Sequence, residues 1–586
     1  MLQQRNMSLT TKAMNSFLVA AALSTCATAV NIAVDGIIVG RFVSADALSA
    51  VNLYSPYAQT LSIILLLLLY PASSQAAYFI GERNREETGR FISTSLLSIL
   101  VAGVLLSVTA FVFTDSYVNM VCYDDDGAVA PYLHTYFRIV GSGTLLFLLA
   151  QFACEIVNID GRPSLGTRAI VISVLCNIAL DMLLTVYLGL GVAGSAIATL
   201  IANTVTIVFI ACGHIFTKAC SFTIRIFRQF SVSALKSILK LGGKMSVTSV
   251  FSAFFIYIVY FSAQKCCDEE GLFALSIGMI VFNICLNLAM GVGRSVVSVG
   301  GYLKGLRDWS GFRHIVVRSI RVVLLIGFAV SIAATSGARL LAIAFGADTP
   351  EMVTYCSNAL RIFIWTVPSA MLVTLMMFIY QSMMNLRLIS VPTITFSIAE
   401  IAALLAWPYV LPQESLWYAF PISALLSIGI IYLVSEIARN GDNTIYRFIH
   451  IPKRTDDEDV EQLQCSIPAN KDDMYLSLKS IRAFLDRQDI SDGLEKKLVL
   501  CLEEIFLNIN EHSELKGNDH CFDVIIRMER DGILSVVKDD GHPFNPLAVQ
   551  EEKQGLGLKI LFGICKHVDY QYMYGENLLV LQFPYE

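Results

Sequence analysis

The sequence predicts a membrane protein that is all-α over most of its length, with about twelve transmembrane helices in two six-helix bundles, followed by a soluble α+β domain. Of the 586 residues, 55% are hydrophobic and 15% are charged, and the mean hydropathy of +0.62 is too high for an ordinary soluble protein. Uncharged runs of about 18 residues or more, long enough to cross the hydrocarbon core as helices, recur along the chain. After Arg439 the composition becomes polar and charged.

The basic residues predict how the spans are oriented. The first apolar run continues past the small-residue triplet 27–29, so we expect a retained span and not a cleaved signal peptide. Lys and Arg gather in alternate loops, whereas the intervening segments 123–127 and 412–415 contain none. Because basic loops face the cytoplasm, this pattern predicts a multi-pass plasma-membrane protein with cytoplasmic N- and C-termini. The basic segments are 81–90, 161–168, 218–244, 304–314 and the stretch after Arg439.

The two groups of six spans resemble each other. In each half a cytoplasmic arginine precedes a mid-helix carboxylate by thirteen residues: Arg168 before Asp181, and Arg387 before Glu400. Such a repeat predicts a duplicated bundle with a cargo site between the halves. The segments that echo each other are 45–53 with 269–277, and 81–91 with 301–312. The predicted boundaries are a first lobe at 1–213, a basic connector at 214–240 and a second lobe at 241–438.

Carboxylates inside the predicted spans are the first candidate site. Asp181 lies in the apolar run VLCNIALDMLL, and Asn177 shares its helix face. Asp35 lies late in the first span and Thr199 early in the sixth. An unpaired charge at the centre of the bilayer costs about 2.5–3.5 kcal/mol, so these residues need either a partner or a use. Carboxylate, amide and hydroxyl oxygens suit a hard cation or a shared proton, and hydrogen-bonded packing is the alternative.

Glu400 is a candidate carboxylate of the second lobe. It stands in the eleventh predicted span, at the same offset from its arginine as Asp181. A packing role and a functional role are equally open for Glu400 taken alone.

Two segments resemble a known transporter family. VNIAVDGIIVGRFVSADALSAVNL and CNIALDMLLTVYLGLGVAGSAIAT resemble the first-span and the fifth-to-sixth-span signatures of the multidrug and toxic compound extrusion (MATE) family, over about residues 10–440. The resemblance implies a V of two six-helix bundles that exports organic cations or amphipathic drugs in exchange for Na⁺ or H⁺. It also implies that the coupling cation binds in the amino-terminal lobe, at Asp35, Asn177, Asp181 and Thr199.

The chain departs from some branches of that family in the seventh span. That span has no carboxylate, and the repeat places Val259 in register with Asp35. We therefore expect coupling in the first lobe, and Glu400 remains the candidate of the second. A lipid-linked flippase of the same superfamily is a less favoured alternative, because the first-lobe motif fits the drug exporters.

Residues 470–586, after a polar linker at 439–469, predict one compact α+β domain. The first two segments have helical periodicity, and the next two alternate apolar and polar residues like strands joined at a turn. A glycine-rich start indicates a third helix, which a closing hairpin follows. In chain order these elements are helices at 472–488 and 492–513, strands at 521–530 and 532–540, a helix at 555–568 and a hairpin at 569–584.

Three short motifs in this domain point to a nucleotide. Each of them alone is typical of a solvated helix face, a turn or a loop. Together and in this order they resemble the N, G1 and G2 boxes of the GHKL ATP-binding fold, most closely those of the anti-sigma-factor serine kinases. The residues that carry the resemblance are Glu504, Asn508 and His512 at a spacing of four, Asp539 and Gly541 after a strand, and Gly555 and Gly557 at a helix start.

The resemblance implies a role for each of these residues. ATP and Mg²⁺ would be the cofactors, and a serine on a small partner domain of the anti-anti-sigma type would be the phosphate acceptor. Asn508 would hold Mg²⁺, Asp539 would bond the adenine amino group, Gly541 would line the base pocket, Gly555 and Gly557 would face the phosphates, and Glu504 would be the general base.

Two functions follow from these motifs. The first is a cation-coupled exporter whose ATP-binding domain regulates it or signals from it. The chain has no G-x-x-x-x-G-K-[ST] loop, so we do not expect ATP to power transport. The second is a receptor-like protein in which a transporter-derived membrane part controls a protein serine kinase. Membrane lipid and a drug-like cargo are the expected partners, and no nucleic acid is.

Overall fold

The computed structural model describes the chain except for residues 1–4, 123–128, 218–224, 226, 267–268, 348, 411–412, 440–443, 447–450, 453–460, 489, 513–516, 549–555 and 586. It divides into two compact units. One unit is Phe17–Ile451, and the other is Pro452–Glu586 together with Met1–Ser16. We describe each unit by itself.

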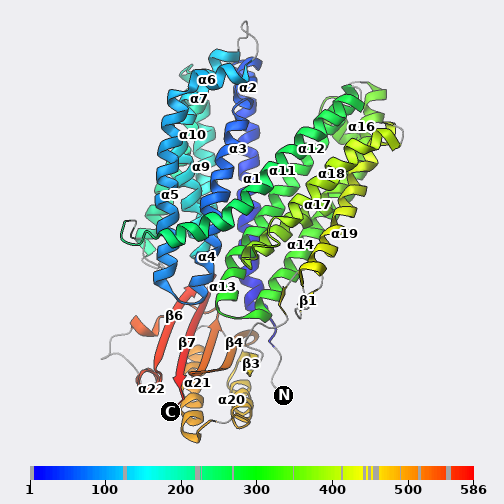
Figure 1. Ribbon diagram of the computed structural model, residues 1–586. Helices are drawn as coiled ribbons and strands as arrows, with labels where there is room; N and C mark the ends of the chain where they lie inside the picture. The colour runs from blue at the N-terminus through cyan, green and yellow to red at the C-terminus, as the bar shows by residue number, and fades with distance from the viewer. Residues whose placement is uncertain are drawn as a thin grey trace. The chain divides into compact units, whose positions relative to one another are not determined.

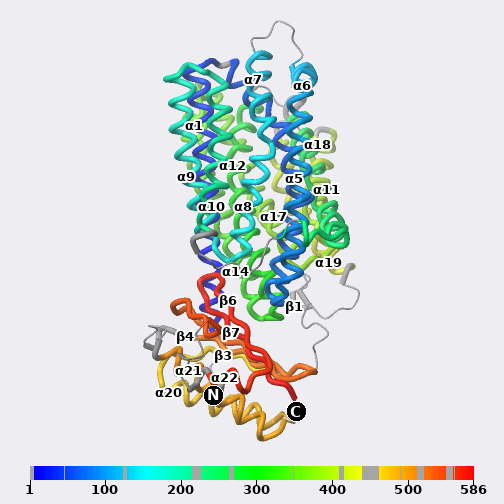
Figure 2. The backbone as a smooth tube through the Cα atoms, turned by 90° about the vertical axis from the view of Figure 1, so that its left-hand side faces the viewer, coloured from blue at the N-terminus to red at the C-terminus, as the bar shows by residue number. Residues whose placement is uncertain are grey.

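The larger unit is helical and consists of two bundles that diverge toward one end (Figure 1). Figure 2 shows its long helices running in a common direction. The first bundle contains α1 (Ser8–Phe42), α2 (Ala45–Asn52), α3 (Ser55–Ile64), the π-helical segment η1 (Leu65–Leu69), α4 (Tyr70–Gly81), α5 (Arg85–Val112), α6 (Thr114–Val121), α7 (Val129–Ser142), α8 (Thr144–Ile159), α9 (Pro163–Asp181), the π-helical segment η2 (Met182–Tyr187) and α10 (Val192–Thr217).

The second bundle repeats the same plan. It contains α11 (Val232–Cys266), α12 (Glu269–Ser295), the π-helical segment η3 (Val296–Gly300), α13 (Gly301–Gly305), α14 (Trp309–Ser336), α15 (Ala338–Ala344), α16 (Pro350–Phe363), η4 (Ile364–Thr366), α17 (Val367–Ser382), α18 (Val391–Val410), η5 (Gln413–Tyr418) and α19 (Ala419–Arg439).

The spans agree with the expected multi-pass membrane fold. Among the described residues, ten helices are long and apolar enough to cross a bilayer, and the pair α7 and α8, bent by 50°, makes an eleventh. The shorter apolar helix Val391–Trp407 takes the place of the remaining predicted span. The fold class is therefore confirmed, with one of the expected twelve spans shorter than the others.

The turns that follow α4 and α13 confirm the internal repeat. Arg83 and Arg307 both adopt positive φ, +60° and +57°. Asn84 and Asp308 then cap α5 and α14, each accepting a hydrogen bond from the backbone N–H three residues later. Both turns therefore have the same conformation and the same kind of cap.

The smaller unit contains a five-stranded antiparallel sheet in the order β3-β4-β5-β7-β6. The strands are β3 (Gln462–Ala469), β4 (Gly517–Glu529), β5 (Gly532–Asp539), β6 (His567–Met573) and β7 (Glu576–Pro584), and the helices are α20 (Lys471–Leu485), α21 (Asp492–His512) and α22 (Leu556–Ile564). A short 3₁₀ turn, η6, covers Pro546–Ala548, and a two-stranded pair, β1 (Thr444–Tyr446) with β2 (Ile451–Pro452), lies in the linker.

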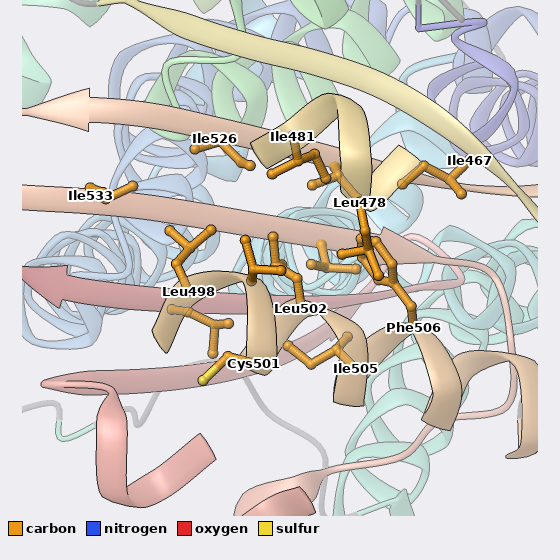
Figure 3. Close-up of a cluster of buried hydrophobic side chains, with 14 of the residues drawn as sticks. Ile467, Leu478, Ile481, Leu498, Cys501, Leu502, Ile505, Phe506, Ile526 and Ile533 are labelled. Atoms are coloured by element: carbon orange, nitrogen blue, oxygen red, sulfur yellow. The ribbon is translucent and has the colours of Figure 1, made fainter. Parts of the chain in front are cut away.

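The helices α20 and α21 pack on one face of this sheet through a continuous apolar core. Figure 3 shows Leu498, Leu502 and Phe506 of α21 beside Ile526 and Ile533 of the strands. All five are buried. The three residues of α21 recur at the spacing of one amphipathic helix face. The predicted elements of the domain are confirmed. However, the predicted linker at 439–469 also contains β3, which the sequence pattern did not predict.

The opposite face of the sheet is also buried. Asp523 of β4 stands directly opposite Ser466 of β3 and Lys538 of β5, and all three are at most 2% exposed. The N-terminal segment belongs to this unit, since Arg5 forms an ion pair with Asp523. Residues 1–16, expected in the first lobe, are therefore grouped with the C-terminal domain.

Candidate functional site

The first candidate site lies where α1 and α9 meet. These helices are joined at one level by a hydrogen bond of 3.1 Å from the Thr167 hydroxyl to the Ala20 carbonyl. Asp35 follows Ala20 by fifteen residues and Asp181 follows Thr167 by fourteen, so nearly equal helical rises bring them to one level. The two carboxyl groups lie there within range of each other's side-chain interaction. The structure thus brings together the two acids that the sequence singled out.

The polar groups around this pair lack hydrogen-bond partners among the described residues. Asn177 and Asp181 are 2% and 0% exposed. Among the described residues, no partner hydrogen-bonds either oxygen of Asp181, one oxygen of Asp35 or either amide atom of Asn177. The carboxamide oxygen of Asn31 and the hydroxyl of Thr185 are likewise buried and unbonded. Buried polar atoms are normally satisfied, so this cluster is arranged for something other than internal hydrogen bonding.

Thr185 was not predicted, although the signal was present in the sequence. It follows Asp181 by four residues, as Asp181 follows Asn177, so all three lie on one face. The helix is α-helical to Asp181 and π-helical from Met182. Single π turns recur at functional sites, because they free a backbone group from the regular ladder.

Among the described residues, Thr199 makes no hydrogen bond to Asp35 or Asp181. Its hydroxyl donates to the carbonyl of Ser195, 3.1 Å away on the same helix. Ser195 itself is the α10 side chain beside Asp181. The buried ring of Tyr136 on α7 is a further neighbour of both aspartates.

Glu400 is fully buried in the second bundle. It is 0% exposed, and within the described part of the chain neither carboxyl oxygen completes a hydrogen bond. Ser423 of α19 is its recorded polar neighbour. Val259, in register with Asp35, is also 0% exposed and apolar. Within the described residues, the second bundle therefore places one acid where the first places two.

The two bundles touch each other closely between α4 and α13. A Cβ added to Gly81 would lie 2.1 Å from the Tyr302 carbonyl, and one added to Gly305 would lie 2.1 Å from the Tyr78 carbonyl. Side chains cannot fit at such distances, so only glycine allows this backbone contact. Arg294 of α12 reaches across as well, donating to the Tyr70 hydroxyl at 3.0 Å. These contacts close the bundles against each other at this end.

The second candidate site lies at the end of β5 in the C-terminal domain. The Asp539 carboxylate accepts from the Gly541 backbone N–H at 2.9 Å and from the Asn577 amide at 2.9 Å, both through Oδ1. Burial raises the pKa of Asp539, while these two hydrogen bonds act in the opposite direction. Since both bonds use Oδ1, Oδ2 is the oxygen that suits an adenine amino group. The adenine contact of Asp539 stays a prediction.

Asn577 holds the loop that follows β5, and the sequence did not predict this role. Its amide nitrogen also approaches the carbonyls of Gly541 and His542, at 3.3 and 3.1 Å. Its carboxamide oxygen accepts from the Tyr570 hydroxyl at 2.6 Å. The only sequence signal would have been strand register, since Asn577 is the β7 partner of Asp539.

The remaining predicted residues lie on α21 and α22. Glu504 and Asn508 are half-buried on α21, one turn apart. Gly557 is in the first turn of α22. Gly555 and the side chain of His512 lie outside the described residues. No cluster of three or more His, Cys, Asp or Glu side chains in the described ranges could hold a metal.

Comparisons with known proteins match both parts of the chain to family models. A family model described as MatE matches residues 20–183 and 244–404, and one described as a histidine kinase-like ATPase domain matches 467–583. The multidrug export protein MepA of Staphylococcus haemolyticus is 28% identical over 175 residues, which is 29% of this chain. The matched stretch spans only 37% of that relative's length.

Solved structures of transporters share the fold of the helical unit. One is titled a crystal structure of MATE in the straight conformation, with a TM-score of 0.65 and 22% identity, over 72% of this chain and 96% of that one. Another, titled an outward-facing multidrug resistance MATE family transporter, has a TM-score of 0.66 and 20% identity, over 76% and 100%. A transporter of the MOP superfamily from Pyrococcus furiosus has a TM-score of 0.63 and 19% identity, over 75% and 99%.

Proposed function

Because the chain belongs to the MatE family of membrane transporters and carries a histidine kinase-like ATPase domain at its C-terminus, we propose that it is a cation-coupled antiporter of the plasma membrane. It exports organic cations or amphipathic drug-like compounds in exchange for Na⁺ or H⁺. The C-terminal domain binds ATP and regulates the transporter or signals from it, and both termini are cytoplasmic.

The contact between Asp35 and Asp181 carries this proposal. Two carboxylates side by side in a low-dielectric interior cannot both stay charged without a counter-ion. The described residues supply no cationic partner and no donor to either oxygen of Asp181. A proton or a sodium ion is what this arrangement accepts, and the Asn177 oxygen is a suitable further ligand for sodium.

Antiport follows if the cation and the cargo favour different arrangements of the two bundles. The close contact at Gly81 and Gly305 belongs to one arrangement, and it must separate for cargo to enter from that end. Occupation of the Asp35–Asp181 pair by a cation changes the charge of the first bundle. A ligand shifts such an equilibrium only through its different affinity for the two states.

The test is gradient-driven transport in everted vesicles, with ethidium as the organic cation. An imposed sodium or proton gradient should drive ethidium uptake, and Asp181→Asn should abolish the gradient-dependent part. Asp46→Asn, which neutralises an exposed aspartate of the same bundle, is the matched control and should transport normally. Equal transport by both variants would refute ion coupling at this pair.

Asp539 and its loop support ATP binding by the C-terminal domain. We assign Asp539 to the adenine amino group, Gly541 to the base pocket, Gly555 and Gly557 to the phosphates, and Asn508 to Mg²⁺. In this proposal the bound nucleotide regulates and does not drive transport. Asp539→Asn should therefore abolish nucleotide binding but leave ethidium uptake responsive to the ion gradient.

The position of Glu504 supports a second candidate function. Glu504 and Asn508 share one face of α21, as a general base and a Mg²⁺ ligand of a serine kinase would. The membrane part would then sense a ligand and control phosphorylation of a small anti-anti-sigma-type partner. Ligand-dependent serine phosphorylation that Glu504→Ala abolishes, without any ethidium transport, would favour this candidate over the first.

A further inference from the structure

The N-terminal segment, residues 5–16, contacts the face of the C-terminal sheet that lies opposite α20 and α21. The Arg5 guanidinium lies 2.7 Å from the Asp523 carboxylate, and the two side chains are 2% and 0% exposed. Asp523 also accepts from the Ser466 hydroxyl at 2.6 Å, and that hydroxyl accepts from the Asn6 backbone N–H at 3.0 Å. Removing one partner of a buried ion pair leaves an uncompensated charge. The sheet is thus built to receive this segment.

A second contact ties the same segment to the nucleotide loop. The Lys12 ammonium forms an ion pair with the Asp540 carboxylate. Asp540 follows Asp539 directly and precedes Gly541, so it stands within the loop that we assign to the adenine. This contact is half-exposed on the lysine side, at 57%, against 15% for the aspartate. An exposed ion pair contributes little stability. The buried Arg5–Asp523 pair therefore anchors the segment, whereas the Lys12–Asp540 pair is the contact that a change in the loop can make or break.

The segment leads into a single continuous helix. Helix α1 runs from Ser8 to Phe42 without a break, and it carries Asn31 and Asp35. A helix transmits a displacement along its axis because each turn is hydrogen-bonded to the next.

We propose that residues 5–16 are the docking element through which the nucleotide-binding domain acts on α1, with Arg5 as the anchor on the sheet and Lys12 as the contact that responds to nucleotide at the Asp539 loop. The inference rests on the proposed function, because it requires ATP to bind beside Asp539. It goes further in naming the segment that transmits the nucleotide state. Arg5 and Lys12 act as positioning residues and touch no substrate.

The test is hydrogen–deuterium exchange of residues 5–16 in the full-length protein in lipid nanodiscs, with and without Mg-ATP. We expect bound ATP to slow exchange in this segment by about tenfold, within the usual range of coupling between two sites. Lys12→Ala should remove the response and, because coupling between two sites is reciprocal, should weaken ATP affinity by up to the same factor. Arg41→Ala, which removes a basic side chain from the opposite end of α1, is the matched control and should keep the response.

The anchor has its own test, which does not require nucleotide. Arg5→Asp should raise exchange in residues 5–16 by at least tenfold, and adding Asp523→Arg should restore protection by reversing the pair. Failure of the double variant to restore protection would overturn the anchor. A fluorescent ATP analogue monitors binding separately, so absence of binding would count against the proposed function. Binding without any change in exchange, or with the same change in Lys12→Ala, would overturn the inference.

Discussion

Replacing Asn577 by alanine tests how the nucleotide loop is built. The substitution removes a hydrogen bond to the Asp539 carboxylate and contacts to the carbonyls of Gly541 and His542. A hydrogen bond to a charged group contributes about 1.5–3 kcal/mol and one between neutral groups about 0.5–1.5 kcal/mol. Water can replace the contact at His542, which is exposed. We therefore expect the loop to lose about 2–4 kcal/mol of local stability.

ATP affinity should fall by about 10- to 100-fold in this variant, because each 1.4 kcal/mol corresponds to a factor of ten. Fluorescence titration with an ATP analogue on the full-length protein measures the change. Asn545→Ala is the matched control, since Asn545 lies in the same loop but is exposed, and its side chain accepts one hydrogen bond there, from the Leu547 N–H. It should bind within about twofold of the parent protein. Equal affinities for the two variants would refute our account of the loop.

The pH dependence of binding tests the same carboxylate. Adenine donates to ionised Asp539, so affinity should be lost as the pH falls through the pKa of Asp539, which burial raises above 3.8. The Asn577 hydrogen bond lowers that pKa, so Asn577→Ala should move the loss of affinity to higher pH. In Asn545→Ala the profile should not move. A shift toward lower pH in Asn577→Ala would contradict the assigned contacts.

Two further predictions concern the membrane unit. Gly81→Ala should disfavour the arrangement in which α4 and α13 touch, since its Cβ would meet the Tyr302 carbonyl at 2.1 Å. A cysteine introduced at the bundle contact should therefore react faster with a thiol reagent. Gly429→Ala, with no atom within 4 Å of its added Cβ, should leave that reaction rate unchanged. Glu400→Gln should retain gradient-driven ethidium uptake, since the described residues place no second acid beside Glu400. Loss of uptake equal to that of Asp181→Asn would place coupling in both bundles.

Much of the fold was predictable because it depends on local patterns. Apolar run lengths predicted the spans, and the i, i+4 spacing of Asn177 and Asp181 predicted their shared face. The turn residues Arg83 and Arg307 lie in segments whose resemblance was visible in the sequence. The pattern predicted α20 and α21 because their apolar residues recur at helical spacing.

The features that were missed depend on contacts between distant segments. β3 contains Pro468, and only pairing with β4 makes it a strand. Asn577 becomes an organising residue only through the β5–β7 register. Arg5 and Asp523 are separated by more than five hundred residues. No local periodicity indicates such partners, because tertiary packing selects them.

The central claim is that the Asp35–Asp181 pair exchanges its cation for cargo, and release of that cation tests it most directly. Purified full-length protein in nanodiscs is loaded with sodium or equilibrated at low buffer strength, and ethidium is added while a sodium electrode or a pH indicator records the solution. We predict that ethidium displaces the coupling ion from the parent protein and that Asp35→Asn and Asp181→Asn release none. Undiminished release from both variants would contradict the account.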